Sequence, residues 1–195
     1  STLSSSSAAS DVYKRQLLTR NSAPRLTTPI PKENQLEIAY KCALRAPDHA
    51  WIRPWKFIQI SGKGLDKLSK AFVNTAKKLD KNVDPEILKK YKDAPYRAPL
   101  IIVLVADTKE HPKVPVIEQQ LSTATAGQNM LLAFHEMGFG GIWRTGKFSF
   151  NKEISMQLNL KENEIVIGYL YIGTVEGKTK KIPELNSKDF VITWE

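Results

Sequence analysis

Cysteine and histidine are scarce in this chain, and their scarcity argues against two kinds of structure. The 195 residues include one cysteine, Cys42, and three histidines. A single cysteine cannot form a disulfide within the chain, so we expect a protein of the reducing cytoplasm. Cys42 lies in an apolar helical pattern, which favours a buried, inert thiol over a catalytic one. The histidines are scattered and lack metal-ligand spacing, so no metal site is predicted.

Long apolar runs are also missing. The longest, residues 99–106, is far shorter than the about 20 residues that a transmembrane helix needs, so we expect no membrane partner. Apolar residues nevertheless make up 42% of the chain, which is enough for a globular core.

Acidic residues are outnumbered, 20 against 29 basic ones, which gives a net charge of +9. This balance is compatible with a nucleic-acid-binding module, the competing interpretation from another functional class. Nucleic-acid binders concentrate cations along one element or interleave them with exposed aromatic residues. Here the lysines are spread over several helical patterns and a late run, Lys178, Lys180 and Lys181. We interpret the charge as a solvated surface and expect no nucleic-acid partner.

The standard nucleotide and catalytic signatures are absent. No G-x-x-x-x-G-K-[ST] sequence occurs, which excludes a P-loop. The glycine-rich residues 138–143 follow a helical pattern instead of opening one, and their third glycine is missing, so a Rossmann fingerprint is rejected. His135 and Glu136 begin like a zincin motif, but Phe139 stands where the second histidine is needed. No side chain is predicted to act as a catalytic nucleophile.

Residues 1–16 lack the apolar side chains that a core needs. Residues 1–10 are a low-complexity serine and alanine stretch, and residues 11–16 resemble the translation of a transposase adapter used in making sequencing libraries. A signal peptide would need an apolar core of about 7–15 residues, which this stretch does not contain. We therefore expect residues 1–16 to be a non-native or disordered extension and residues 17–195 to form the domain.

The rest of the sequence alternates helical and strand patterns. Helices are predicted over residues 31–45, 65–79, 84–92, 118–137 and 151–158, after a short helical segment at Leu17 and Leu18. Strands are predicted over residues 55–60, 100–105, 140–144 and 165–173, with an extended tail at 190–194. The continuous apolar run 100–105 is typical of a strand covered on both faces. This order predicts an α+β domain with a central mixed sheet between helices.

Three short clusters could carry chemistry. Residues 20–25 place two arginines and a serine together, which could clamp a phosphate or could simply be a helix end with surface arginines. Residues 45–49 are a proline-stiffened loop displaying Arg45 and His49, although Asp48 could merely pair with Arg45. Residues 138–146 have closely spaced glycines that let backbone N–H groups approach a ligand, or they form a plain turn between helix and strand.

Taken together, these clusters in this order resemble the nitroreductase family, and in particular one small bacterial subgroup of it. Residues 17–22, 45–49, 53–55, 94–99 and 138–144 match the subgroup's pattern, and the similarity extends over about residues 17–194. The resemblance implies a nitroreductase-like α+β fold with a mixed, mostly antiparallel sheet. It also implies an intertwined homodimer that binds FMN at the subunit interface, with the C-terminal strand pairing with the partner's sheet.

The resemblance further assigns cofactor-binding residues. Arg20, Asn21 and Ser22 would hold the phosphate and ribityl chain of FMN. Arg45 and His49 would reach the flavin from the partner subunit, with Arg45 stabilising the negative charge of its reduced form. The flavin would be lined on the first subunit by Trp143, Arg144 and Thr145. The segment that would contact NAD(P)H is Ala133, Phe134, His135, Glu136, Met137 and Gly138.

Two positions depart from the family pattern. Asn21 stands where relatives usually carry a second arginine, which weakens the expected grip on phosphate. Thr145 replaces a serine but keeps the hydroxyl group.

The implied activity is an FMN-dependent NAD(P)H oxidoreductase that reduces a small-molecule electron acceptor, nitroaromatic or quinone-like, by ping-pong hydride transfer. The alternative is a dedicated flavoenzyme of the same fold with one non-nitro substrate, as in reductive dehalogenation.

Overall fold

The computed structural model describes residues 14, 16–178 and 180–195. Residues 16–19 are helical, which confirms the helical segment predicted at Leu17 and Leu18. The expectation of a non-native extension over residues 1–16 lies, apart from residues 14 and 16, outside the described residues.

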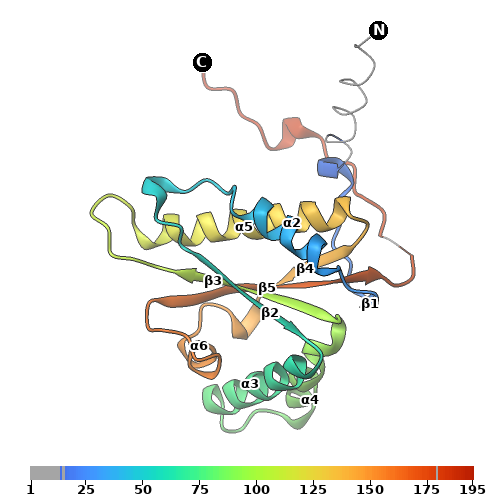
Figure 1. Ribbon diagram of the computed structural model, residues 1–195, viewed down its shortest axis with the longest axis vertical. Coiled ribbons are helices and arrows are strands. Elements are labelled where there is room, and N and C mark those ends of the chain that lie inside the picture. Colours follow the sequence, from blue (N-terminus) through green and yellow to red (C-terminus); the bar gives the residue numbers. More distant parts are fainter. Residues whose placement is uncertain (1–13, 15, 179) are drawn as a thin grey trace.

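An antiparallel sheet forms the middle layer of the domain (Figure 1). The strands are β1 (Leu26–Thr27), β2 (Trp55–Ser61), β3 (Leu100–Asp107), β4 (Gly140–Arg144) and β5 (Glu164–Val175). The hydrogen-bonded order is β1-β5-β3-β2, and β4 pairs with β5 as well. All four strand pairs are antiparallel, while one isolated parallel bridge joins Ser22 to Gly141. The predicted mixed, mostly antiparallel sheet is therefore confirmed.

Helices cover both faces of this sheet, as Figure 1 shows. The helices α2 (Glu33–Ala43) and α5 (Val116–Glu136) lie on one face. The helices α3 (Lys63–Leu79), α4 (Pro85–Asp93) and α6 (Lys152–Gln157) lie on the other. None of the described helices is both long and apolar enough to cross a membrane.

Strand β3 divides the core in two because its side chains alternate between the faces. Ile101 and Val103 join the cluster beneath α3, whereas Ile102 and Leu104 pack toward α2 and α5. All residues of β3 up to Ala106 are fully buried, which confirms the prediction of a strand covered on both sides.

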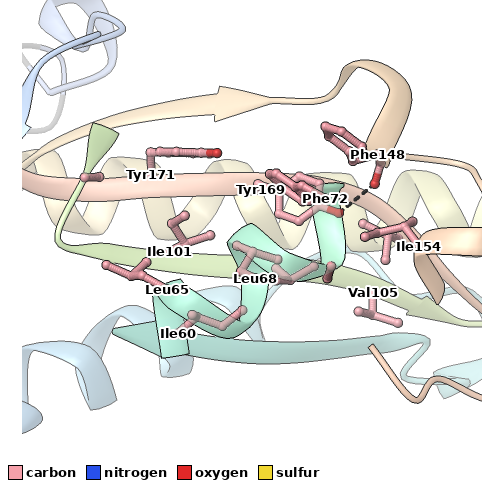
Figure 2. Close-up of a cluster of buried hydrophobic side chains, with 14 of the residues drawn as sticks. Ile60, Leu65, Leu68, Phe72, Ile101, Val105, Phe148, Ile154, Tyr169 and Tyr171 are labelled. Atoms are coloured by element: carbon pink, nitrogen blue, oxygen red, sulfur yellow. Dashed lines mark hydrogen bonds between the residues drawn. The ribbon is translucent and has the colours of Figure 1, made fainter. Parts of the chain in front are cut away.

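Aromatic rings fill the core on the α3 side (Figure 2). Phe72 and Phe148 stack with ring centroids 4.1 Å apart, and Tyr169 meets Phe72 edge-on. The buried Tyr169 hydroxyl donates a 2.6 Å hydrogen bond to the carbonyl of Phe148. Each ring contributes about 1.5–3 kcal/mol by burial, so this cluster anchors the loop between β4 and α6.

Several element boundaries differ from the predicted ones. Helix α2 begins at Glu33 because Pro29 and Pro31 hold the preceding segment extended. Helix α5 begins at Val116, two residues early, with extended Pro115 as its N-cap. Asp84 caps α4 as predicted, accepting a 2.7 Å bond from the Glu86 N–H. Residues 190–194 form no strand within the single chain, and the pairing of this tail with a partner's sheet stays a prediction.

Candidate functional site

Three segments enclose a pocket of about 560 Å³ beside the end of β5. The N-terminal segment is held there by backbone hydrogen bonds: Ala23 donates to Gly141 over 3.2 Å, and Glu176 donates to Arg25 over 3.2 Å. The pocket is lined by Thr19, Asn21, Ser22, Ala23, Pro24, Arg25, His135, Gly138, Phe139, Gly140, Val175, Glu176, Gly177, Lys178, Lys180 and Ile182.

Two of the three residues predicted to hold phosphate line this pocket. Ser22 and Asn21 are among its walls, whereas the neighbouring Arg20 is half-buried outside the lining. The Asn21 side chain accepts a 2.8 Å bond from the Ser22 N–H and donates a 3.1 Å bond to the carbonyl of Lys180. Asn21 therefore links the N-terminal segment to the C-terminal one.

Two residues of the segment predicted to contact NAD(P)H, His135 and Gly138, line the same pocket. His135 lines the pocket, with its Nε2 3.0 Å from the Thr19 hydroxyl, and Gly138 follows it at the end of α5. Phe134 is fully buried in the core on the α5 side, and Ala133 and Met137 pack against that core. Glu136 is exposed and does not line the pocket.

Two cations in the pocket wall, Lys178 and Lys180, were interpreted from the sequence as surface charge. They line the pocket together with Arg25, which belongs to the cluster suggested as a phosphate clamp, and among the described lining residues Glu176 is the single acid. Their charges favour an anionic ligand. The signal that could have identified the two lysines is their position, because residues that directly follow a buried strand lie near that strand's end.

The first residue of the predicted flavin wall, Trp143, is half-buried and packs against the core on the α5 side. Its ring packs against Gly127 of α5 and Gly168 of β5, where a Cβ on Gly127 would stand 2.8 Å from the indole Cζ3. Glycine is needed at both positions because any larger residue would collide with the ring. The half-buried indole packs beneath β4, and its place beside a flavin stays a prediction.

Arg144, the next residue along β4, faces the other side of the sheet. Its guanidinium lies 5.4 Å from the ring centroid of Tyr171, a cation–π contact. Among the described residues, its Nε is buried with no hydrogen-bond partner. Desolvation lowers the pKa of Arg144, and the charge of Arg97 lowers it further. Burial raises the pKa of Tyr171 to about 12. Arg144 thus has a buried donor for which the described residues supply no acceptor, while Thr145 beside it is exposed.

Arg45 and His49 lie far from the pocket within one chain. His49 Nδ1 is 2.8 Å from Glu118 Oε2 in the first turn of α5, whereas Gly138 follows the last turn. The 21 residues of α5 span about 30 Å at 1.5 Å per residue. Both Arg45 and His49 are exposed.

The loop that carries His49 is strained and clamped. Ala50, Trp51 and Arg53 have φ of 57°, 54° and 52°, the left-handed region that costs a non-glycine residue about 1–3 kcal/mol. Asp48 accepts a 2.8 Å bond from the Arg53 N–H, so the suggested pairing of Asp48 with Arg45 is replaced by a bond within the loop.

Side chains of α5 and its preceding loop hold the same segment from outside. Ser122 donates to the carbonyl of Pro47 over 2.6 Å, and Thr123 donates to that of Pro54 over 3.1 Å. The Lys109 ammonium donates to the carbonyl of Ile52 over 2.7 Å. Local strain of this kind persists only where the surroundings over-determine it.

The comparisons with known proteins identify the family. The model of the Nitroreductase family matches residues 26–174. The chain belongs to the nitroreductase family. It is accordingly an oxidoreductase, and the fold and family predicted from its motifs are confirmed. YdjA of Escherichia coli strain K12, provisionally named an NAD(P)H nitroreductase, is 37% identical over 162 residues, 83% of this chain and 87% of that protein.

Solved nitroreductase structures have the same fold. A nitroreductase-like family protein from Bacillus cereus superposes with a TM-score of 0.79 at 22% identity, covering 93% of this chain and 95% of that one. An FMN-dependent nitroreductase from Clostridium difficile superposes with a TM-score of 0.65 at 24% identity, covering 89% and 94%.

Proposed function

We propose that this nitroreductase-family chain is an FMN-dependent NAD(P)H oxidoreductase that reduces small nitroaromatic or quinone-like acceptors by a ping-pong scheme. The observation that carries the proposal is the cationic pocket, in which Arg25, Lys178 and Lys180 surround the backbone of residues 21–22 and 138–140. Its volume of about 560 Å³ lies in the usual range for cofactor sites, roughly 300–1,000 Å³. The FMN-dependent and NAD(P)H-linked names of two relatives support the same assignment.

The residues present fit FMN on two counts. The three cations and the Ser22 hydroxyl are donors suited to a phosphate dianion. The unpaired Nε of Arg144 is a donor suited to a polar heteroatom of the ring system. When bound, FMN would supply the two-electron hydride chemistry. The chain's own part is to bind the phosphate, orient the ring and stabilise negative charge beside Arg144.

We also propose that the protein is a cytoplasmic homodimer in which Arg45 and His49 address the partner's flavin. The face formed by α2 and α5 exposes Ile38, Leu44, Ile117 and Leu121, and the tail exposes Phe190, Val191, Ile192 and Trp194. Apolar side chains exposed together on one face favour an interface. The proposed location rests on the single cysteine.

Absorbance spectroscopy tests the central proposal. The purified protein is expected to be yellow, or to become so with added FMN, and to bleach when NADH or NADPH is added without oxygen. Turnover is then measured with one nitroaromatic and one quinone. Bleaching without turnover of either acceptor would point to a dedicated acceptor, the alternative function. A colourless protein that takes up no FMN would refute the proposal.

A further inference from the structure

The imidazole of His49 is hydrogen-bonded to the rest of the chain through one ring nitrogen, Nδ1. Its Nδ1 lies 2.8 Å from Glu118 Oε2, and both side chains are about half-exposed, at 55% and 45%. An ion pair this exposed contributes little to stability because solvent and salt screen it. The contact therefore adds little to the stability of the fold. Its main effect is to set the direction of the imidazole ring.

Both partners of this pair stand on anchored backbone. On the Glu118 side, the next residue is the buried Gln119, whose side chain bonds the N–H and the carbonyl of Lys109, each over 2.8 Å. On the His49 side, the loop is held by the Ser122 bond to Pro47 and by the Asp48 bond to Arg53. An imidazole ring whose own loop and whose hydrogen-bond partner are both anchored is preorganised for a ligand.

The carboxylate also decides which nitrogen carries the proton. Oε2 of Glu118 can only accept, so Nδ1 of His49 donates, and the neutral ring has its lone pair on Nε2. In a protonated ring Nε2 is a donor as well. In either state, Nε2 is the nitrogen left to face a group outside this chain.

We propose that Glu118 is a positioning residue for His49, fixing the tautomer and direction of the ring so that Nε2 contacts the FMN bound by the partner subunit. This inference rests on the proposed function, since it needs a flavin at the interface. Glu118 itself touches no ligand. Nothing in the sequence pointed to it, because the pairing joins residues 69 positions apart.

FMN titration of the full-length, flavin-stripped protein tests the proposal, with FMN fluorescence as the readout of Kd. Glu118→Ala is expected to weaken FMN binding about tenfold, the loss associated with one charge-assisted hydrogen bond. Glu118→Gln is expected to stay within about twofold of wild type, because its amide oxygen still accepts from Nδ1. The matched control Glu162→Ala, an exposed glutamate before β5, is expected to bind like wild type.

A double-mutant cycle separates positioning from an independent structural role. His49→Ala is expected to weaken binding about as much as Glu118→Ala, and the double variant to be no weaker than His49→Ala alone. Additive losses, or a Glu118→Gln variant as weak as Glu118→Ala, would overturn the proposal. If Glu118→Ala does not fold, Glu118→Asp, whose carboxylate is withdrawn by one methylene, takes its place with the same expectations.

FMN binding by the wild type and by Glu118→Ala distinguishes a failure of the proposed function from a failure of the proposed role of Glu118. A wild-type protein that binds no FMN refutes the proposed function. A wild-type protein that binds FMN, alongside a Glu118→Ala variant that binds equally well, leaves the function standing and refutes the role of Glu118.

Discussion

Glu164 places a carboxylate in the core at the start of β5, with only 4% of the residue exposed. Burial raises its pKa, but the 2.7 Å bond from the Lys56 ammonium and the 2.9 Å bond from the Lys161 N–H outweigh this. The pKa of Glu164 therefore lies below its usual range. Since Lys56 is half-exposed, the contribution of the pair is reduced by solvent screening.

The substitution Glu164→Gln is expected to lower the free energy of unfolding at pH 7 by about 1–2 kcal/mol. A carboxyl whose folded pKa is depressed stabilises the fold above its unfolded pKa and loses that contribution as the pH falls through the folded pKa. The difference between wild type and variant should therefore shrink in acid. Urea denaturation at pH 7 and at pH 3 measures this, with the exposed Glu162→Gln as the control. A difference that is the same at both pH values would contradict the argument.

Gly168 tests the placement of Trp143 in the core. A Cβ at this position would overlap the indole Nε1, so Gly168→Ala must displace either the ring or β5. Overpacking of this kind costs about 1–3 kcal/mol. Thermal denaturation should show a lowered Tm, whereas an unchanged Tm would mean that the ring does not occupy this space in solution.

The same tryptophan shows what the sequence could and could not reveal at this scale. The run 138–146 identified β4 and its glycines, but it did not reveal which residues pack against the Trp143 ring. The space that the ring occupies is left by Gly127 and Gly168, which belong to α5 and β5 and not to the run itself. Spacing along one strand cannot reveal such partners, because they depend on how α5 and β5 come together.

At the scale of elements, α5 both supports the sheet and fixes a loop. Ser122→Ala removes the 2.6 Å bond to the Pro47 carbonyl and is expected to cost about 1 kcal/mol. Because this bond restrains a strained segment, amide hydrogen exchange should accelerate at residues 48–53. Thr125→Ala is the matched control, since its hydroxyl bonds only the Leu121 carbonyl within the same helix. Equal exchange in the two variants would show that Ser122 does not restrain the loop.

The elements themselves were largely predictable, since their patterns are local. Short stretches rich in β-forming residues, with the continuous apolar run in β3, located all four longer strands, and helical spacing located α3 and α5 to within about two residues. The hydrogen bonds that restrain the loop were not predictable, because each joins a side chain of α5, or of the loop before α5, to a backbone carbonyl in residues 47–54. No periodicity records a bond of that kind.

At the scale of the molecule, charge and apolar surface are unevenly distributed. The lysines that sequence analysis assigned to solvent include Lys178 and Lys180, which the return of the chain past β5 brings to the pocket. Of the apolar residues left exposed, one group lies on or beside α2 and α5 and another on the tail, while Leu79, Ile87 and Met156 are exposed on the opposite face. The described part of the chain therefore has a pocket lined by three cations and an exposed apolar group that the proposed homodimer would cover.

The tail is the part of this surface that can be changed without touching the core. Residues 190–195 are all exposed, with Trp194 at 99%, and they extend away from the domain on the side of α2 and α5 (Figure 1). The double substitution Ile192→Ser and Trp194→Ser should leave the fold intact and shift the protein from dimer toward monomer in sedimentation velocity. FMN binding should weaken in parallel, because Arg45 and His49 would no longer meet the partner's site.

Met156→Ser provides the control, since Met156 is an exposed apolar residue on α6, on the opposite face of the sheet. It should remain dimeric and bind FMN like wild type. A tail variant that stays dimeric would place the interface on α2 and α5 alone. A wild-type protein that is monomeric yet binds FMN would remove the dimer and require Arg45 and His49 to act on something other than a partner's flavin.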